Sequence, residues 1–427
     1  MKPISLADFA GMVGGELVAK DSSPEIQGFA TDSRQVVPGD LFLAIKGART
    51  DGHEYVPIAI ENGAIATLAE RPVKGPYILV ADLVQALAKM AAHYRDQFQG
   101  SVIGITGSAG KTTTKELLAA ALAPIGKVVK TEGNRNTEFT APLLWPEVTA
   151  DTKAVVVEMA MRGKGQIAHL AFFSKPTVGL VTNIGWSHVG EVGSREGIAE
   201  AKSELLNAVP RDGIAILPVD DEFFSVLEEH SEGRQIYTFG TSDSADCRVI
   251  KVQSEGWDGS TINGFFADIP WQVHLPYLGL HLGLNVAAAI CACAGLGLAP
   301  QEAADAMGEA VLPPMRMQVL EWRGIHVLLD AYNASPSSMR AAIDTFMELP
   351  CEGNRYAIIG QMNELGAESE LAHRELINYM QQQELANVWT FGDLWAQHGL
   401  SAPEPDIESL RSSITILKPG DSILIKG

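Results

Sequence analysis

Continuous apolar runs, separated by helical segments, constrain the fold of this chain more than any other feature of its sequence. The runs are rich in β-branched residues and lack the polar alternation of a half-exposed strand: SVIGIT (101–106), AVVVEMA (154–160), TVGLVTN (177–183) and GIAILPV (213–219). Such runs are typical of parallel strands buried on both faces. Helical stretches between them complete β-α-β units. The sequence therefore predicts an α/β protein built around a parallel sheet.

The length of 427 residues predicts more than one domain, because a domain usually holds about 100–200 residues. We place three domains, at residues 1–82, 83–312 and 313–427. The first is a small α/β module, with a Pro-Gly-Asp turn before an apolar strand at 41–45. The second begins with an amphipathic helix and turns to antiparallel strands after Gly240. The third is an α/β unit with strands HVLLDAY, YAIIGQM, NVWTFG and SILIKG.

The net charge of −20 argues against nucleic acid and anionic membrane as partners, because both would be repelled over most of the surface. The most lipid-like run, VAAAICACAGLGLA, is shorter than the roughly 20 residues needed to span a bilayer. We expect a buried helix there and no membrane insertion. The N-terminus has no continuous apolar core like that of a signal peptide.

The four cysteines, at positions 247, 291, 293 and 351, have neither zinc-site spacing nor the density of a disulfide framework. Cys291 and Cys293 lie in the apolar run, where core packing is favoured over a metal-ligand role. Reduced thiols fit a cytoplasmic protein best, and that is the location we expect.

The segment GITGSAGKTTTK (104–115) has the sequence context of a phosphate-binding loop. It follows the strand SVIGIT and leads into a helix, so that glycines let backbone N–H groups approach phosphate oxygens and the helix N-terminus adds its positive end. Lys111 would neutralise phosphate charge, and the Thr112 hydroxyl would hold Mg²⁺. Ile105 stands where the common Gly-x-x-x-x-Gly-Lys-[Ser/Thr] pattern has its first Gly. An ordinary strand-to-helix turn with a solvated lysine is the alternative.

Polar residues also follow the next two strands, and ligands in open α/β sheets bind beyond the carboxyl ends of strands. Glu158 ends one strand, and Asn183 and His188 follow the other. Taken alone, Glu158 fits a salt bridge and His188 fits a structural or solvated role. Lys202, in the helical segment GIAEAKSELLNAV, would by composition be a solvated lysine. Three successive strand ends carrying such groups favour a site with Mg²⁺, which prefers oxygen ligands.

At these residues the sequence resembles the Mur ligases of peptidoglycan synthesis, ATP-dependent enzymes that join a UDP-muramoyl (peptide) carboxylate to an amino group. Residues 106–112 match their phosphate loop, Thr-Gly-[Ser/Thr]-x-Gly-Lys-Thr, which is a shorter variant of the common pattern. The resemblance also rests on TDSRQVVPGDLFLAIKGARTDGHEYVPIAIENGA, TEGNRNTEFTAPL, TNIGWSH with the downstream AKSEL, DAYNASPSSM and IIGQMNELG. It thus extends over nearly the whole chain.

The resemblance implies a small α/β UDP-binding domain (1–82), a central P-loop ATPase domain with a parallel sheet (83–312) and a C-terminal Rossmann-like α/β domain (313–427) that binds an incoming dipeptide. It implies an ATP-dependent ligase that adds D-alanyl-D-alanine to UDP-N-acetylmuramoyl-tripeptide through an acyl phosphate. Alternatives are a ligase that adds the third peptide residue, a folylpolyglutamate-like ligase, a non-catalytic nucleotide-binding relative and a P-loop kinase. We expect a monomer.

The family motifs assign roles to individual residues of this sequence. ATP would contact Gly107, Ser108, Ala109, Gly110, Lys111, Thr112, Thr113, Asn285, Arg316 and Asp330. One Mg²⁺ would be held by Thr112 and Glu158, and a second by His188 and by Lys202 converted to a carbamate. Lys111, Glu158, His188 and Lys202 would be the catalytic group. Substrate contacts would come from Ser33, Arg34, Lys46 and Gly47 at the UDP end, Asn134, Asn136 and Thr137 near the sugar and peptide, and Asn333, Ser335 and Glu364 near the dipeptide.

The sequence departs from the family pattern at a few positions. Thr137 and Thr140 replace Asn and Gly in the substrate loop, and Leu282 replaces an Asn in the adenine segment. The others are Met315 for the Gly before Arg316, Ser335 for an Asn, and Gln361 for an Asp. Most of these changes concern substrate fit.

Overall fold

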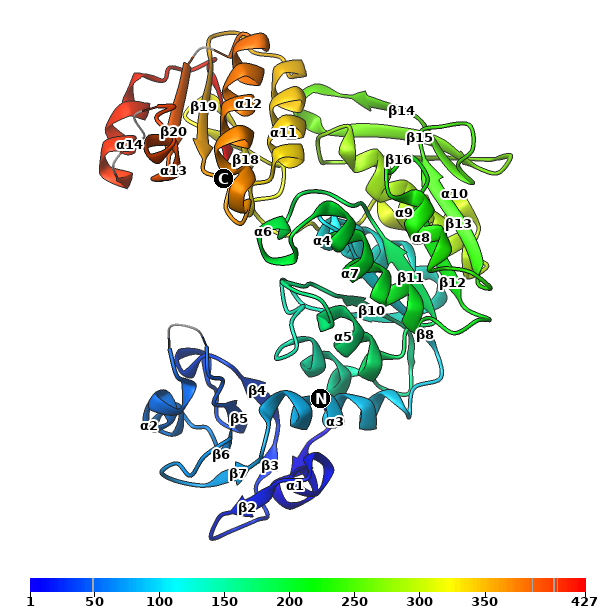
Figure 1. Ribbon diagram of the computed structural model, residues 1–427, viewed down its shortest axis with the longest axis vertical. Coiled ribbons are helices and arrows are strands. Elements are labelled where there is room, and N and C mark those ends of the chain that lie inside the picture. The colour runs from blue at the N-terminus through cyan, green and yellow to red at the C-terminus, as the bar shows by residue number, and fades with distance from the viewer. Residues whose placement is uncertain (48–49, 386, 402–403, 405) are drawn as a thin grey trace. The chain divides into compact units, whose positions relative to one another are not determined.

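The computed structural model describes residues 1–47, 50–385, 387–401, 404 and 406–427 (Figure 1). It divides into two compact units. Unit 1 comprises residues 1–104, 126–161 and 166–177, and unit 2 comprises residues 105–125, 162–165 and 178–427. Ala48 and Arg49, within the segment that resembles a uridine-binding domain, lie outside the described residues.

The first 82 residues of unit 1 form a small α/β layer structure. Its five-stranded sheet has the order β2-β7-β6-β5-β4, in which β4 to β7 run parallel and β2 is antiparallel to β7. The strands are β2 (Glu16–Val18), β4 (Gly28–Ala30), β5 (Asp40–Leu43), β6 (Ala66–Ala69) and β7 (Tyr77–Leu79). A two-stranded ribbon, β1 (Ile4–Ser5) with β3 (Glu25–Ile26), and the helices α1 (Leu6–Val13) and α2 (Val56–Glu61) complete it. The predicted turn and strand at 38–45 are confirmed by β5.

The predicted amphipathic helix is α3 (Leu83–Arg95), which begins at Asp82, whose side chain accepts the N–H of Gln85. Leu83, Leu87 and Met90 face the core of the N-terminal sheet, as the three- and four-residue spacing predicts. Unit 1 also holds the start of β8 (Ser101–Thr106), which neighbours β10 (Thr152–Glu158) and then β9 (Lys127–Lys130). The helix α5 (Gln166–Ser174) and the 3₁₀ segment η4 (Ala141–Glu147) belong to it as well.

Unit 2 contains the end of β8 and six further strands of the same sheet, in the order β8-β11-β12-β13-β14-β15-β16. Strands β11 to β14 are parallel, and β14, β15 and β16 are antiparallel, as predicted for the segments after Gly240. The strands are β11 (Val178–Val181), β12 (Ile214–Pro218), β13 (Gln235–Gly240), β14 (Cys247–Ser254), β15 (Ser260–Phe266) and β16 (Ile269–Leu275). Strands β11 and β12 consist of buried residues, apart from the partly exposed Ile214 that opens β12.

Helices of unit 2 include α4 (Lys111–Ala121), α6 (Val189–Val192), α7 (Arg195–Ala208), α8 (Phe224–Glu229), α9 (His281–Gly295) and α10 (Pro300–Met307). Helix α9 is the apolar run, and Cys291 and Cys293 are fully buried in it. No helix in the described part of the chain has the length and apolar character needed to cross a membrane.

The C-terminal part of unit 2 is a five-stranded sheet in the order β17-β18-β21-β19-β20. Its strands are β17 (Gln318–Trp322), β18 (Ile325–Asp330), β19 (Arg355–Gly360), β20 (Asn387–Phe391) and β21 (Ser422–Lys426). All pair in parallel except β17, which forms a hairpin with β18. The helices are α11 (Pro336–Glu348), α12 (Ser369–Gln382), α13 (Leu394–Gln397) and α14 (Ile407–Ser413). The predicted α/β fold with parallel sheets is confirmed.

Candidate active site

The predicted phosphate loop connects β8 to α4 through two glycines in the left-handed half of backbone space. Gly107 has φ 151° and Gly110, which precedes the helix, has φ 78°. A Cβ at Gly107 would lie 1.8 Å from the Thr182 hydroxyl oxygen, and one at Gly110 would lie 2.5 Å from the Asn285 side-chain oxygen. Both separations are far below van der Waals contact. Glycine is therefore required at both positions, because the backbone conformation disfavours other residues and because there is no space for a Cβ.

The end of β11 braces the loop through hydrogen bonds. The Ala109 N–H donates to Asn183 Oδ1 at 3.0 Å, and Asn183 Nδ2 donates to the Ala109 carbonyl at 3.0 Å. The Thr182 hydroxyl donates to the same carbonyl at 2.6 Å. The Ser108 N–H donates to the Asn183 carbonyl at 3.0 Å. These bonds hold the loop in one shape and occupy the N–H groups of Ser108 and Ala109, so the backbone needs little reorganisation when an anion arrives at the start of α4.

The first turn of α4 carries the charged and hydroxyl groups of the loop. Lys111 folds back so that Nζ donates to the Gly107 carbonyl at 2.7 Å. Thr112 is buried at the helix start, and Thr113 is partly exposed. Gly110 supplies no side-chain cap. Helix N–H groups without a side-chain cap, together with the positive end of the helix dipole, form a favourable anion site.

Lys202, on α7, is a buried lysine beside this loop, with an exposed fraction of 2%. Burial lowers its pKa well below the ordinary value, and the charge of Lys111 lowers it further. No hydrogen bond or ion pair reaches its Nζ from any described residue. Burial therefore disfavours the charged form of Lys202, which is not the solvated lysine that composition alone suggests.

His188 precedes α6 in a left-handed conformation, with φ 67°. Its Nδ1 lies 2.7 Å from Glu364 Oε2. Burial lowers the pKa of His188, the Glu364 carboxylate opposes that shift, and Lys111 and Lys202 reinforce it. The Gly190 N–H also donates to the Glu364 carbonyl at 3.4 Å. His188, a predicted metal ligand, thus contacts Glu364, a predicted neighbour of the dipeptide.

Arg316 and Asp330 are placed by contacts that sequence reasoning did not identify. Arg316 Nη2 donates to the Thr112 hydroxyl at 3.1 Å, and its guanidinium carbon lies 4.0 Å from the centre of the Tyr332 ring. Asp330 Oδ2 lies 3.2 Å from Nζ of Lys426, whose side chain is 1% exposed. Lys426 also donates to the Asn333 carbonyl. Only its position at the carboxyl end of an expected strand, SILIKG, could have suggested Lys426.

Three other predicted site residues make hydrogen bonds to residues of unit 2. Asn285 is buried and accepts a hydrogen bond from the Thr114 hydroxyl at 3.2 Å. Asn333 Oδ1 accepts the Ala334 N–H at 2.9 Å. Ser335 is the N-cap of α11 and forms a reciprocal capping box with Ser338. The Ser335 side chain therefore already caps the N-terminus of α11.

In unit 1, the structure joins Glu158 to the predicted substrate loop. Glu158 ends β10 with an exposed fraction of 1%, and its Oε1 accepts a hydrogen bond from Asn136 Nδ2 at 2.7 Å. Its own N–H donates to the Thr131 hydroxyl at 3.0 Å. The Asn136 N–H donates to the Asn134 carbonyl at 2.8 Å, and the hydroxyls of Thr137 and Thr140 lie 3.0 Å apart. A movement of the loop would therefore change the contacts of the Glu158 carboxylate.

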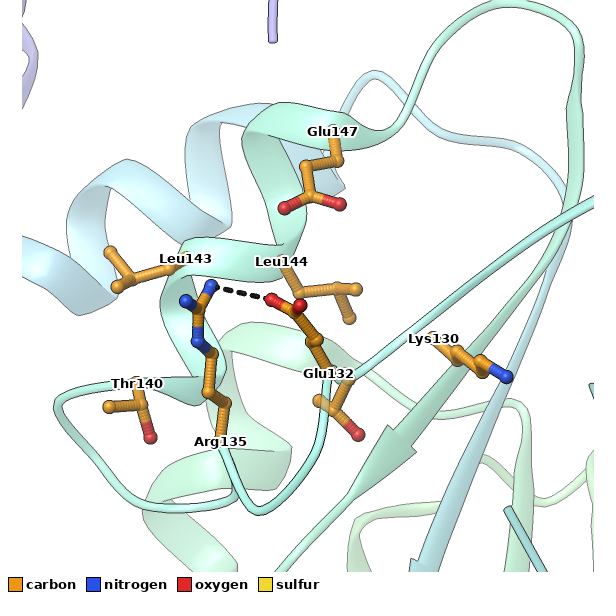
Figure 2. A pocket seen from close by; sticks show the side chains of 8 residues that line it. Lys130, Glu132, Arg135, Thr140, Leu143, Leu144 and Glu147 are labelled. Atoms are coloured by element: carbon orange, nitrogen blue, oxygen red, sulfur yellow. Dashed lines mark ion pairs between the residues drawn. The ribbon is translucent and has the colours of Figure 1, made fainter. Parts of the chain in front are cut away.

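A small pocket lies beside this loop (Figure 2). It is lined by Lys130, Thr131, Glu132, Arg135, Thr140, Leu143, Leu144 and Glu147. Arg135 Nη1 lies 3.0 Å from Glu132 Oε2. Burial raises the pKa of Glu147, and the nearby charge of Glu132 raises it further. Thr131, whose hydroxyl accepts the Glu158 N–H, also lines this pocket.

At the predicted uridine end, the four residues contact other residues of unit 1, three of them through the backbone. Ser33 is buried, and its carbonyl accepts a hydrogen bond from Asn62 Nδ2 at 2.9 Å. Arg34 is 84% exposed and lies 2.6 Å from Asp32, where it lowers the pKa of that carboxyl to about 2. Lys46 and Asp51 pair through their backbones in an isolated antiparallel β-bridge, and the Gly47 N–H donates to the Thr50 carbonyl at 2.9 Å.

Family models match three segments of the chain: the Mur ligase family catalytic domain (25–125), the Mur ligase middle domain (105–293) and the Mur ligase glutamate ligase domain (315–427). The sequence is 37% identical over 400 residues to the UDP-N-acetylmuramoyl-tripeptide–D-alanyl-D-alanine ligase of Bacillus subtilis, covering 92% of this chain and 86% of the relative. The chain belongs to the Mur ligase family.

Solved structures agree with this membership. A MurF crystal structure from Acinetobacter baumannii superposes with a TM-score of 0.88 at 28% identity, covering 100% of this chain and 96% of the other. MurF ligase from Thermotoga maritima in complex with ADP superposes with a TM-score of 0.81 at 32% identity, covering 94% and 93%. The three-domain Mur ligase architecture predicted from the sequence is thereby confirmed.

One departure from the Mur ligase pattern gains a physical meaning in the structure. Met315 stands where the family has Gly, and its φ is 61°. Left-handed backbone suits glycine, while another residue there costs about 1–2 kcal/mol. The chain therefore keeps a strained backbone immediately before Arg316.

The loop fits the phosphates of ATP, because its backbone is braced by Asn183 and it leads into the start of α4, which has no side-chain cap. For Mg²⁺ the donor set is mixed. No group of three or more His, Cys, Asp or Glu side chains suited to a metal occurs among the residues that the structure describes. The ligands implied by the family are the Thr112 hydroxyl, the Glu158 carboxylate, the His188 imidazole and a modified Lys202. Only two of these four are His or carboxylate side chains, so this set would not form such a group.

Proposed function

We propose that this chain is the Mur ligase that adds D-alanyl-D-alanine to UDP-N-acetylmuramoyl-tripeptide with consumption of ATP. The observation that carries the proposal is the phosphate loop, whose glycine cradle and braced backbone suit a nucleotide triphosphate. Relatives named for this reaction match nearly the full chain. ATP binding is further supported by the ADP complex of the Thermotoga maritima ligase.

The chemistry follows from the weakness of a carboxylate as an electrophile. Transfer of the γ-phosphoryl group of ATP to the terminal carboxylate of the tripeptide breaks the bond to ADP and forms an acyl phosphate. The amine of the dipeptide attacks the acyl carbon and releases inorganic phosphate, leaving an amide. Lys111 and the N–H groups of the loop stabilise the phosphate charge while these bonds change.

Two Mg²⁺ ions would supply further positive charge against the crowded carboxylate and triphosphate. Thr112 and Glu158 are the proposed ligands of one ion, and His188 and a carbamate on Lys202 are those of the other. A neutral amine is the form that reacts with CO₂, and burial without a counter-ion favours that form of Lys202. Carbamylation would convert this amine into an anionic oxygen ligand.

The remaining assignments are part of the same proposal. The domains are 1–82 for the UDP end, 83–312 for ATP and 313–427 for the dipeptide. Nucleotide contacts beyond the loop would be Asn285, Arg316 and Asp330. Substrate contacts would be Ser33, Arg34, Lys46, Gly47, Asn134, Asn136, Thr137, Asn333, Ser335 and Glu364. A monomeric state and a cytoplasmic location stay predictions.

The test is release of inorganic phosphate from ATP with UDP-N-acetylmuramoyl-tripeptide, with and without D-alanyl-D-alanine. We expect sustained release only when the dipeptide is present, together with a pentapeptide product by mass spectrometry. A kinase would release no phosphate and would accumulate a phosphorylated substrate without any amine. A third-residue ligase would require the shorter UDP-muramoyl-dipeptide and a single amino acid, and a non-catalytic relative would bind nucleotide without turnover.

Lys111→Ala should reduce this phosphate release by at least about 10²–10³-fold, because it removes a preorganised positive group from the phosphate site. Lys127→Ala, on β9 with a largely exposed side chain, is the matched control and should leave turnover unchanged. Near-normal turnover in Lys111→Ala would refute the phosphate-loop assignment.

A further inference from the structure

Arg316 is held between an aromatic ring and the phosphate loop. Its guanidinium carbon lies 4.0 Å from the centre of the Tyr332 ring, and Nη2 donates to the Thr112 hydroxyl at 3.1 Å. We propose that Tyr332 is a positioning residue, which fixes the Arg316 guanidinium over the phosphate loop so that it meets the terminal phosphates of a nucleoside triphosphate. This inference rests on the proposed function for the identity of the anion.

The backbone on both sides of Arg316 is held in an unusual conformation. Met315 has φ 61° and Met317 has φ 46°, both in the left-handed region. The Met315 N–H donates to Gln318 Oε1 at 3.1 Å, and the Met317 N–H donates to Asp330 Oδ1 at 3.3 Å. Strained residues persist only where the surrounding structure determines them, and they concentrate at functional sites. The backbone therefore aims the Arg316 side chain, and what remains to be fixed is its guanidinium.

The Tyr332 ring and one hydrogen bond restrain the Arg316 guanidinium. The Nε of Arg316 is buried and has no hydrogen-bond partner within the described part of the chain. No carboxylate forms an ion pair with Arg316 among the described residues. A cation within about 6 Å of a tyrosine ring centre is attracted by the ring quadrupole. Tyr332 thus restrains Arg316 through the ring face, in addition to the single hydrogen bond to Thr112.

The Tyr332 ring leaves the positive charge of Arg316 available to a ligand, whereas a carboxylate partner would neutralise it. A carboxylate would neutralise the guanidinium and compete with phosphate for its N–H groups, as Asp32 does for Arg34. The ring orients Arg316 while leaving its full charge and its remaining N–H donors for an anion. Tyr332 is 42% exposed, so truncating it removes the contact without opening a cavity in the core.

The experiment measures the dissociation constants of ADP and of a non-hydrolysable ATP analogue by calorimetry, and the KM for ATP in phosphate release. The variants are Tyr332→Phe, Tyr332→Leu, Arg316→Met and the double variant Arg316→Met/Tyr332→Leu. Tyr332→Phe keeps the ring face and should stay within about twofold of wild type. Tyr332→Leu should weaken binding of the ATP analogue roughly three- to thirtyfold, which is the range expected for losing a cation–π contact. Tyr55→Leu, an exposed tyrosine of the N-terminal sheet region, is the control and should have no effect.

The double variant decides whether Tyr332 acts through Arg316. If it does, Tyr332→Leu adds no further loss once Arg316 is Met, because coupled residues are not additive. Additive losses, or a Tyr332→Phe variant as weak as Tyr332→Leu, would overturn the inference. The binding measurements need no ligation. A wild-type protein that binds the analogue but fails to ligate would count against the proposed function alone, while the same variants would still test Tyr332.

Discussion

The phosphate loop and the predicted uridine end both carry cations for an anionic ligand, and they are built in opposite ways. At the loop, Lys202 is buried without a counter-ion, and Arg316 rests on an aromatic ring. At the uridine end, Arg34 is exposed and already bound to Asp32. The first arrangement leaves the charge of Arg316 unneutralised, and the burial of Lys202 without a counter-ion carries a cost in stability. The second holds a neutralised pair that a ligand must open.

The same contrast applies to the backbone. The loop is shaped by two glycines and by hydrogen bonds from Thr182 and Asn183, so its donors are in place before a ligand binds. Ser33 and Gly47 lie in turns whose backbone groups bond to neighbouring residues. We infer that phosphate affinity at the loop is preorganised, whereas binding at the uridine end requires local exchange of partners. Substitutions at the loop should therefore have large effects and those at the uridine end small ones.

The largest effect is expected from Gly107→Ala. The new Cβ would meet the Thr182 hydroxyl oxygen at 1.8 Å, in a backbone conformation that disfavours alanine. The loop must move, and loss of its preorganised donors should lower phosphate release by about 10²-fold or more. Gly297→Ala is the control, because its φ of 87° is also left-handed but nothing lies within 4 Å. If the two variants lose activity equally, the close packing of the loop is not what matters.

Lys202→Met should change the pH dependence of stability in CO₂-free buffer. Because burial depresses the folded-state pKa of Lys202 below 10.5, the unfolded chain binds more protons between the two pKa values, and the stability of the wild type rises with pH across that window. The methionine variant lacks this penalty, so it should have the higher Tm at neutral pH, with the difference shrinking as pH is raised. Differential scanning calorimetry between pH 7 and pH 9 measures this. A variant with a lower Tm at neutral pH would contradict the account of an unpartnered buried lysine.

The smallest effect is expected from Arg34→Ala. Arg34 is exposed to solvent and already paired with Asp32, so its attraction for a uridine diphosphate is weak, although its removal leaves the Asp32 carboxylate unpaired. The KM for the UDP substrate should rise by at most about fivefold, with the KM for ATP unchanged. Arg71→Ala, an exposed arginine paired with Asp51, is the control. A hundredfold rise in KM would show that the uridine end is as preorganised as the loop.

Much of the fold could be predicted because its signals are local. The buried strands β8, β10, β11 and β12 are continuous apolar runs, and each lies within about two residues of its expected place. Beyond the N-terminal 82 residues, β9, β13 and β17 have no counterpart among the predicted strands. The first and third are largely exposed, and β13 mixes polar and apolar residues, so none gives a continuous apolar run.

The site was predictable only where a motif is contiguous. The loop at 107–113 could be recognised from its glycines and from the flanking strand and helix. The pair of His188 with Glu364, and the contacts of Tyr332 and Lys426, join segments far apart in the sequence with no local pattern to announce them. The burial of Lys202 was likewise hidden, because a lysine on a helix is usually solvated. Met315 could be noticed only as a replacement for the glycine of the family.

The central claim is that the nucleotide binds at the loop between β8 and α4. A crystal structure of the protein with a non-hydrolysable ATP analogue and Mg²⁺ tests it most directly. The account predicts β- and γ-phosphate density against the N–H groups of residues 107–113, with Lys111 moved from the Gly107 carbonyl to a phosphate oxygen. Density for the analogue at another place, with this loop free of phosphate, would contradict it.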